Sequence, residues 1–225
     1  MRLKLYFVYF RLAQTPFAYH SIGRRCQSQL KARSYMYTHA KMNPAKKRKT
    51  LVTDVMIDIE TLSTEKNAAI VSIAAIKFNP WEPTEETTCE IFDDVEDCKA
   101  QGCHVSESTL EWWKKQPGAV YKHNFETGPR SSLKEACEKL NEFVAGCSRY
   151  WAQGINFDPV ILESAFAKSE VQPAWKFWQW RDVRTVQKMG SYAPSAKNDH
   201  NPLSDCRNQI AVVKRVFNEL GVKNC

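Results

Sequence analysis

The order of apolar segments from Leu51 onward is the feature that most constrains the fold. Three short segments rich in β-branched residues come first, at Leu51–Ile59, Val71–Phe78 and Cys89–Phe92. Such short spacings predict antiparallel neighbouring strands. Helical stripes then alternate with further β-type segments at Arg149–Gln153 and Phe177–Asp182. This order predicts an α/β fold, in which a mixed sheet of three antiparallel strands followed by parallel strands is flanked by helices.

Two sequences fit the capping box that begins a helix, in which a Ser and a Glu three residues later bond each other's backbone N–H. They are Ser108 with Glu111 and Ser132 with Glu135. We expect Pro117 to end the helix that the first box begins. The helix from the second box has an apolar stripe that predicts one buried face. The stripe consists of Leu133, Ala136, Cys137, Leu140, Phe143 and Val144.

The last two helices are expected at Pro159–Lys168 and after Asn201. Asn201 and Pro202 suit the N-cap and N1 positions, because Pro lacks the N–H that a first helical residue leaves unpaired. The predicted apolar face of the last helix consists of Leu203, Cys206, Ile210, Val213, Phe217 and Leu220.

The charge distribution divides the chain into two parts. Of the 32 Lys and Arg, twelve lie in residues 1–53, which contain no Asp or Glu, and the remaining twenty are set against all 25 acidic residues. We therefore expect a basic leader over residues 1–50 and an organised, mildly acidic domain over residues 51–225. The leader is interpreted as a disordered tail or as a mis-assigned start of translation, with Met42 as the alternative first residue.

Targeting and cysteine usage bear on the compartment. An acid-free leader with Arg, Ser and Tyr also fits mitochondrial targeting by residues 1–41, which we rank below the mis-assigned start. No run of apolar residues approaches the length of a transmembrane helix, so we expect no membrane association. Eight cysteines in 225 residues, without a CxxC pair, indicate reduced thiols rather than a disulfide scaffold. We expect a cytoplasmic protein.

Two carboxylates end the first predicted strand. Asp58 and Glu60 are two residues apart, so the period of a strand places both side chains on one face. Their charges repel unless a cation lies between them, and hard oxygen ligands without Cys or His neighbours suit Mg²⁺ or Mn²⁺. An isolated Asp-x-Glu is common, and on its own it equally fits a strand end turning into solvent.

Three further residues extend this pattern. Asp158 lies at a strand-to-helix junction, and His200 and Asp205 lie on either side of the start of the last helix. A histidine in a loop titrates near neutrality and suits a general base. Four acids of this kind can hold two metal ions about 4 Å apart, which clamp a phosphodiester and prepare a water for in-line attack. Taken singly, each of the three residues also fits an ordinary helix start or surface position.

In these residues and their context the chain resembles the DEDDh 3′–5′ exonucleases of the RNase H-like superfamily, with the phage exonuclease A and exoribonuclease AS branch as the nearest match. The matching segments are Met56–Leu62, Ala69–Phe78, Thr109–Trp113, Trp151–Asp158, Arg184–Thr185 and His200–Asp205. The resemblance implies that residues 51–225 form an exonuclease domain with an RNase H-like sheet. It also implies hydrolysis from the 3′ end of single-stranded DNA or RNA, with release of nucleoside 5′-monophosphates and with a homodimer as one assembly. If a phage encodes the chain, the expected location is the host cytoplasm.

The resemblance also implies roles for individual residues. Asp58, Glu60, Asp158 and Asp205 would hold two Mg²⁺ or Mn²⁺ ions, and His200 would take the proton from the attacking water. Contacts to the terminal nucleotide would come from a second set of residues. That set consists of Ile59, Thr61, Leu62, Trp112, Trp113, Asn156 and Phe157.

Two alternatives remain open at this point. One keeps the chemistry and changes the substrate or partner, as an oligoribonuclease or a proofreading-type exonuclease subunit would. The other is a non-catalytic nucleic-acid-binding module in which the basic leader supplies the affinity. Loss of any of the four acids would favour the second alternative, and none is lost.

Overall fold

A computed structural model describes residues 52–84, 86–191 and 199–223. The expected leader over residues 1–50, with the alternative start at Met42, lies outside these residues. Within them, none of the helices combines the length and the apolar character needed to cross a membrane.

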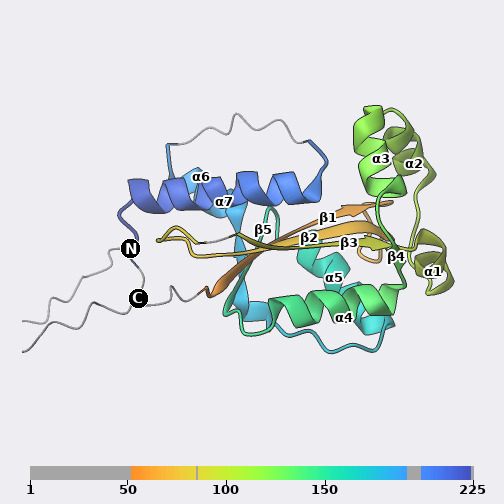
Figure 1. Cartoon of the computed structure of the whole chain (residues 1–225), viewed down its shortest axis with the longest axis horizontal. Coiled ribbons are helices and arrows are strands. Elements are labelled where there is room, and N and C mark those ends of the chain that lie inside the picture. Colours follow the sequence, from red (N-terminus) through yellow and green to blue (C-terminus); the bar gives the residue numbers. More distant parts are fainter. Residues whose placement is uncertain (1–51, 85, 192–198, 224–225) are drawn as a thin grey trace, which may run out of the picture. The chain divides into compact units, whose positions relative to one another are not determined.

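A six-stranded sheet forms the centre of the domain (Figure 1). Its strands are β1 (Asp54–Thr61), β2 (Ile70–Phe78), β3 (Thr87–Asp93), β4 (Arg130–Ser131), β5 (Arg149–Ala152) and β6 (Trp180–Asp182). The spatial order is β4-β3-β2-β1-β5-β6. Strands β1, β2 and β3 are antiparallel neighbours, whereas β5 and β6 run parallel to β1. The predicted mixed sheet is confirmed, and the two-residue β4 is an addition too short for an apolar pattern to reveal.

Helices cover both faces of the sheet and one of its ends. They are α1 (Val95–Ala100), α2 (Glu107–Lys114), α3 (Gly118–Glu126), α4 (Leu133–Val144), α5 (Asp158–Lys168), the 3₁₀ turn η1 (Phe177–Gln179), α6 (Val183–Met189) and α7 (Pro202–Glu219). Figure 1 shows α6 and α7 on one face, α4 and α5 on the other, and α1 to α3 grouped at one end.

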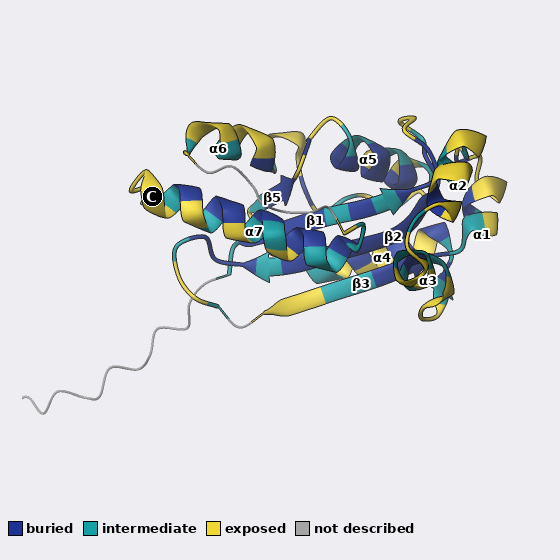
Figure 2. Cartoon of the chain, turned by 90° about the horizontal axis from the view of Figure 1, so that it is seen from above, coloured by how far each residue is buried: buried dark blue, intermediate teal, exposed yellow. Residues whose placement is uncertain are grey.

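The two faces of β1 serve different purposes. Ile57 and Ile59 are buried in the larger apolar cluster with α4 and α5, whereas Met56 is buried in a smaller cluster with α7. Figure 2 shows the central strands almost fully buried between the helical layers. Because alternate residues face alternate layers, Asp58 and Glu60 follow Met56 on the α7 side of the sheet.

The helix boundaries confirm part of the local predictions. The box at Ser132 is present, since Ser132 Oγ accepts from Glu135 N at 3.4 Å and Glu135 Oε2 accepts from Ser132 N at 3.0 Å. Asn201 caps α7 by accepting from Ser204 N at 2.9 Å. The helix α5 begins at Asp158, one residue earlier than predicted. Phe157 is its N-cap, and Pro159 is its second residue.

The predicted box at Ser108 is wrong. The N-cap of α2 is Ser106, two residues earlier, and its hydroxyl contacts Ser108 Oγ instead of a backbone N–H. Pro117 ends α2 as expected but also serves as the N-cap of α3, which the sequence pattern did not predict. Helix α1 was missed as well, although Asp94 caps it by accepting from the N–H groups of Glu96 and Asp97.

The predicted apolar face of α7 is rotated in the structure. Leu220 is 46% exposed, and it is the C-cap rather than a core residue. The buried face instead includes two polar residues that adjoin the predicted stripe, Asp205 and Gln209, and both lie beside the carboxylates of β1. The helix therefore faces the sheet with polar side chains in its first turns and apolar ones, such as Val213 and Val216, further along.

Candidate active site

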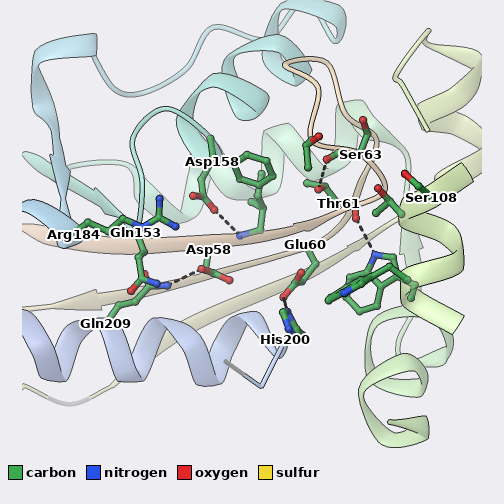
Figure 3. Close-up of a pocket in the computed structure, with 16 residues that line it drawn as sticks. Asp58, Glu60, Thr61, Ser63, Ser108, Gln153, Asp158, Arg184, His200 and Gln209 are labelled. Atoms are coloured by element: carbon green, nitrogen blue, oxygen red, sulfur yellow. Dashed lines mark hydrogen bonds and ion pairs between the residues drawn. The ribbon is translucent and has the colours of Figure 1, made fainter. Parts of the chain in front are cut away.

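The last residues of β1 carry the acidic side chains and have a strand neighbour on one side only. Strand β5 pairs with β1 only from Asp54 to Met56, so β1 continues without that neighbour over its last residues. Asp58 and Glu60 lie on this part of β1, which still pairs with β2, and they point toward α7 (Figure 3). Strand geometry thus brings two carboxylates to one side of the sheet end, as the sequence predicted.

Helix α7 adds the third carboxylate. One carboxylate oxygen each of Asp58, Glu60 and Asp205 lies within 4.8 Å of the other two. Asp205 is 6% exposed, in the first turn of the helix that Asn201 caps. Three convergent carboxylates with no thiolate among them match the ligands that hard divalent cations prefer. The residues present therefore fit a divalent metal ion.

Asp158 approaches the same strand from the start of α5. Its Oδ1 accepts a hydrogen bond from Ile59 N at 3.2 Å, an N–H that β5 no longer reaches. Asp158 is 5% exposed, and its charge raises the pKa of Asp58. Among the described residues, Asp158 is not part of the group whose carboxylate oxygens lie within 4.8 Å of one another. Its charge nevertheless acts on two members of that group, Asp58 and Glu60.

The clustered acids bind protons more tightly than isolated ones. Burial, reinforced by Asp205 and Asp158, raises the pKa of Glu60 to about 8. Burial raises the pKa of Asp158 to about 7 and that of Asp205 to about 6. Burial and the charges of Asp158 and Glu60 raise the pKa of Asp58 well above its ordinary range. Crowded anions without a cation thus favour the protonated forms.

This crowding predicts that the metal-free protein loses stability as pH rises. The folded-state pKa values of about 6 to 8 exceed the ordinary values of 3.8 and 4.5, so the folded state binds more protons between these limits. The stability that these protonated acids contribute is therefore fully present below about pH 4 and is lost as the pH rises to about 8. We expect the Tm in a chelator to drop by about 5 °C or more between pH 5 and pH 8.

Differential scanning fluorimetry across this range, with and without Mg²⁺, tests the prediction. A divalent ion replaces the protons, so added Mg²⁺ should raise the Tm most at the alkaline end. A chelated protein whose Tm peaks at pH 8 would contradict the crowding that the structure indicates.

His200 lies beside the carboxylates. Its Nδ1 is 3.8 Å from Glu60 Oε1, and burial lowers the pKa of its imidazole. The ring packs edge-on against Trp112, with centroids 4.8 Å apart, and against Trp113 at 6.3 Å. Its backbone has a φ of 49°, a left-handed conformation that is uncommon for residues other than glycine.

Asn124 of α3 holds the backbone of His200 in place. Its amide donates to His200 O at 2.8 Å and to Val120 O at 3.1 Å, while its Oδ1 accepts from Ser72 Oγ at 2.7 Å. Asn124 is fully buried, so these bonds are shielded from competing water. A strained residue persists only where its surroundings fix it, and here α3 supplies that restraint.

A cavity of about 490 Å³ opens above the carboxylates. Predicted residues that line it are Asp58, Ile59, Glu60, Thr61, Trp112, Trp113, Phe157, Asp158 and His200. Trp112 is 40% exposed, and its ring lines the cavity. Trp113 is 1% exposed, and its indole N–H donates to Thr61 O at 2.9 Å, so it braces the strand end.

Two predicted contact residues lie outside the cavity lining. Leu62 is 1% exposed in the apolar core, where its backbone bonds Ala69 and Ser106. Asn156 is exposed in the turn before α5 and does not line the cavity. Leu62 follows the irregularity in the β1–β2 register at Glu60 and Thr61, and its side chain enters the core although Ser63 and Thr64 after it line the cavity.

Sequence reasoning assigned no role to two lining residues that the structure emphasises. Arg184 brings a guanidinium to the cavity wall, and its charge partly opposes the rise in the pKa of Asp158 that burial causes. It fits because Gly154 has a φ of 119° and no side chain, and a Cβ there would lie 2.8 Å from Arg184 Nη1. Gln209 Nε2 donates to Asp58 Oδ1 at 2.7 Å. Arg184 lies in one of the segments that carry the family resemblance, although no role was assigned to it, whereas Gln209 has no local signal because its contact is with a residue far away in sequence.

Comparison with known families gives one match over most of the domain. Residues 53–217 match the 3′–5′ exoribonuclease Rv2179c-like domain. The chain is also 27% identical, over 203 residues, to the exodeoxyribonuclease of Enterobacteria phage T4. That alignment covers 72% of this chain and 87% of the phage enzyme.

Solved structures with the same fold include two exonucleases I. The E. coli enzyme in complex with a dT13 oligonucleotide superposes with a TM-score of 0.55 at 12% identity, covering 76% of this chain and 42% of that one. The moderately thermophilic exonuclease I from Methylocaldum szegediense gives a TM-score of 0.57 at 14% identity, with the same coverage. This chain therefore spans less than half the length of these enzymes, and the likeness at this identity concerns the fold.

Proposed function

The chain belongs to the 3′–5′ exoribonuclease Rv2179c-like domain family, and from this premise we propose that it degrades single-stranded nucleic acid from the 3′ end and releases nucleoside 5′-monophosphates. The family supports a 3′–5′ exonuclease that depends on a divalent metal. The observation that carries the proposal is the convergence of Asp58, Glu60 and Asp205, with His200 at 3.8 Å from Glu60.

We propose Asp58, Glu60 and Asp205 as the ligands of one divalent ion, and Asp58 with support from Asp158 as ligands of a second. Mg²⁺ and Mn²⁺ both suit these oxygens. Such ions, when bound, activate a water and stabilise the charge of the attacking and leaving oxygens. The chain's part is to hold four carboxylates in fixed orientations, which the bonds from Gln209 to Asp58 and from Ile59 to Asp158 support.

In this proposal His200 is the general base. Its lowered pKa keeps the imidazole neutral at pH 7, so that one ring nitrogen carries a free lone pair. Nδ1 lies 3.8 Å from Glu60 Oε1, so the imidazole adjoins the carboxylates that would hold the ions and the attacking water. The rings of Trp112 and Trp113 pack against the imidazole and limit its rotation.

The cavity walls suggest how a terminal nucleotide would be held. Trp112 and Phe157 offer aromatic surface on which a base can stack whatever its identity. Arg184 offers a guanidinium that can pair with a phosphate oxygen. Sugar selectivity depends on the 2′-hydroxyl, so single-stranded DNA and RNA both remain substrates of the proposal. A homodimer and a cytoplasmic location also remain proposals.

The test is digestion of 5′-labelled single strands, DNA and RNA in parallel and including an A-rich strand, with Mg²⁺ or Mn²⁺. We expect a ladder that shortens stepwise from the 3′ end and stops when a chelator removes the metal. A 3′-terminal label should appear as a mononucleotide from the first turnover. A matched substrate blocked at its 3′ end serves as control. Release of the 5′ label as a mononucleotide before any shortened intermediates appear, or internal cutting alone, would refute the proposed polarity.

A further inference from the structure

Gln209 is the only side chain on α7, among those the structure describes, whose amide is hydrogen-bonded to a carboxylate of β1. It lies one helical turn after Asp205, so both face the same strand end. The side chain is 4% exposed, and its Nε2 donates to Asp58 Oδ1 at 2.7 Å (Figure 3). Buried contacts of this length fix the orientation of both partners.

Within the part of the chain that the structure describes, the oxygen of the same amide is left without a hydrogen bond, which lowers the stability of the fold. Gln209 Oε1 is buried and has no hydrogen-bond partner among the described residues. Leaving a buried acceptor unpaired costs about 1–3 kcal/mol. Rotating the amide would place its oxygen against the carboxylate oxygen of Asp58, so the observed orientation is the one that the carboxylate selects. A Met or Leu would fill the same space without an unpaired acceptor, so packing alone does not account for an amide here.

We propose that Gln209 is a positioning residue that holds one carboxylate oxygen of Asp58 and thereby aims the carboxylate at the site shared with Glu60 and Asp205. This inference rests on the proposed function, in which Asp58 ligates both ions. Gln209 itself has no ligand role in it. Hydrogen bonds to metal-ligating carboxylates commonly affect metal affinity or activity by about 10- to 100-fold.

The principal variant is Gln209→Met, which keeps the length of the side chain and removes the donor. The matched control is Asn208→Met, which removes an amide from the adjacent, half-buried position of the same helix. The measurement is Mn²⁺ binding without nucleic acid, followed by the electron paramagnetic resonance signal of free Mn²⁺. We expect the Kd for Mn²⁺ to rise about tenfold or more in Gln209→Met and less than twofold in Asn208→Met.

Kinetics distinguish orientation of the ligand from general damage. The metal concentration that gives half-maximal cleavage should rise with the Kd, while the KM for the oligonucleotide stays near the wild-type value and saturating metal restores most of kcat. Gln209→Asn, which keeps the amide but withdraws it by one methylene, should show the same weakening and serves if the Met variant does not fold.

An unchanged Mn²⁺ affinity in a folded Gln209→Met variant, beside a wild type that binds Mn²⁺ and cleaves, would overturn the role of Gln209 alone. A wild type that neither binds Mn²⁺ nor cleaves would overturn the proposed function and this inference together.

Discussion

Asp58→Asn is expected to abolish hydrolysis and to leave a folded protein that melts at a higher temperature than the wild type when no metal is present. The substitution keeps the shape of the side chain and removes the charge that both proposed ion positions share. Loss of several kcal/mol of transition-state stabilisation corresponds to a fall in turnover of about a thousandfold. The measurement is the rate of 3′-end shortening in saturating Mg²⁺.

The gain in stability follows from the same crowding. The charges of Asp158 and Glu60 both raise the pKa of Asp58, so neutralising Asp58 relieves repulsion that the metal-free fold otherwise bears. The Tm in chelator should therefore rise, most clearly at pH 8, and should respond less to added Mg²⁺ than that of the wild type.

Asp93→Asn is the matched control for this variant. Asp93 is fully buried with a pKa well above the ordinary value, yet it does not line the cavity. Its Asn variant should retain wild-type cleavage and the wild-type response to Mg²⁺. Near-full cleavage by Asp58→Asn itself would contradict the assignment of the site.

His200→Ala should lower turnover by about a hundredfold or more while Mn²⁺ binding stays close to the wild-type value. General bases commonly contribute factors of this size. The contrast with Asp58→Asn separates proton transfer from metal binding, since only the Asp58 variant should lose the ion. Single-turnover cleavage at saturating metal, measured from pH 5 to pH 9, follows the effect.

The backbone at this position affects the choice of variant. With a φ of 49°, His200 is better replaced by residues that tolerate the left-handed region, so His200→Asn and His200→Gly accompany the Ala variant. Added imidazole should restore part of the activity to His200→Gly, which leaves both the space and the backbone freedom. Wild-type turnover with an unchanged pH profile in all three variants would remove His200 from the mechanism.

Much of the fold could be predicted because its signals are local. The β-branched run before Asp58 predicts a buried strand, and the Ser132 box and the Asn201 cap each begin a helix where expected. The failures are local as well. Ser106 and Ser108 are both of a residue type that suits the N-cap position, and the path of the chain into α2 places Ser106 there. Leu220 continues a helical period that α7 no longer follows at its C-cap.

The convergence of the acids could be predicted, but the residues that support them could not. The spacing of Asp58 and Glu60 predicts only that they share one face of a strand, and the family resemblance gave this pair a function and added Asp158, His200 and Asp205. Gln209 and Arg184 depend on which helix faces which strand, and no spacing records that. Gly154 is similar, because the need for a residue without a Cβ arises only once Arg184 lies across it.

The helices α2 and α3 affect the site in two ways. Residues of α2 line the cavity, and Asn124 of α3 holds the backbone of His200 through a hydrogen bond to its carbonyl. A drift in the tilt of α3 would move the imidazole even if every carboxylate stayed in place. Substitutions that shift this pair of helices are therefore expected to change the position of His200 as well as the shape of the cavity, unless the bond from Asn124 is kept.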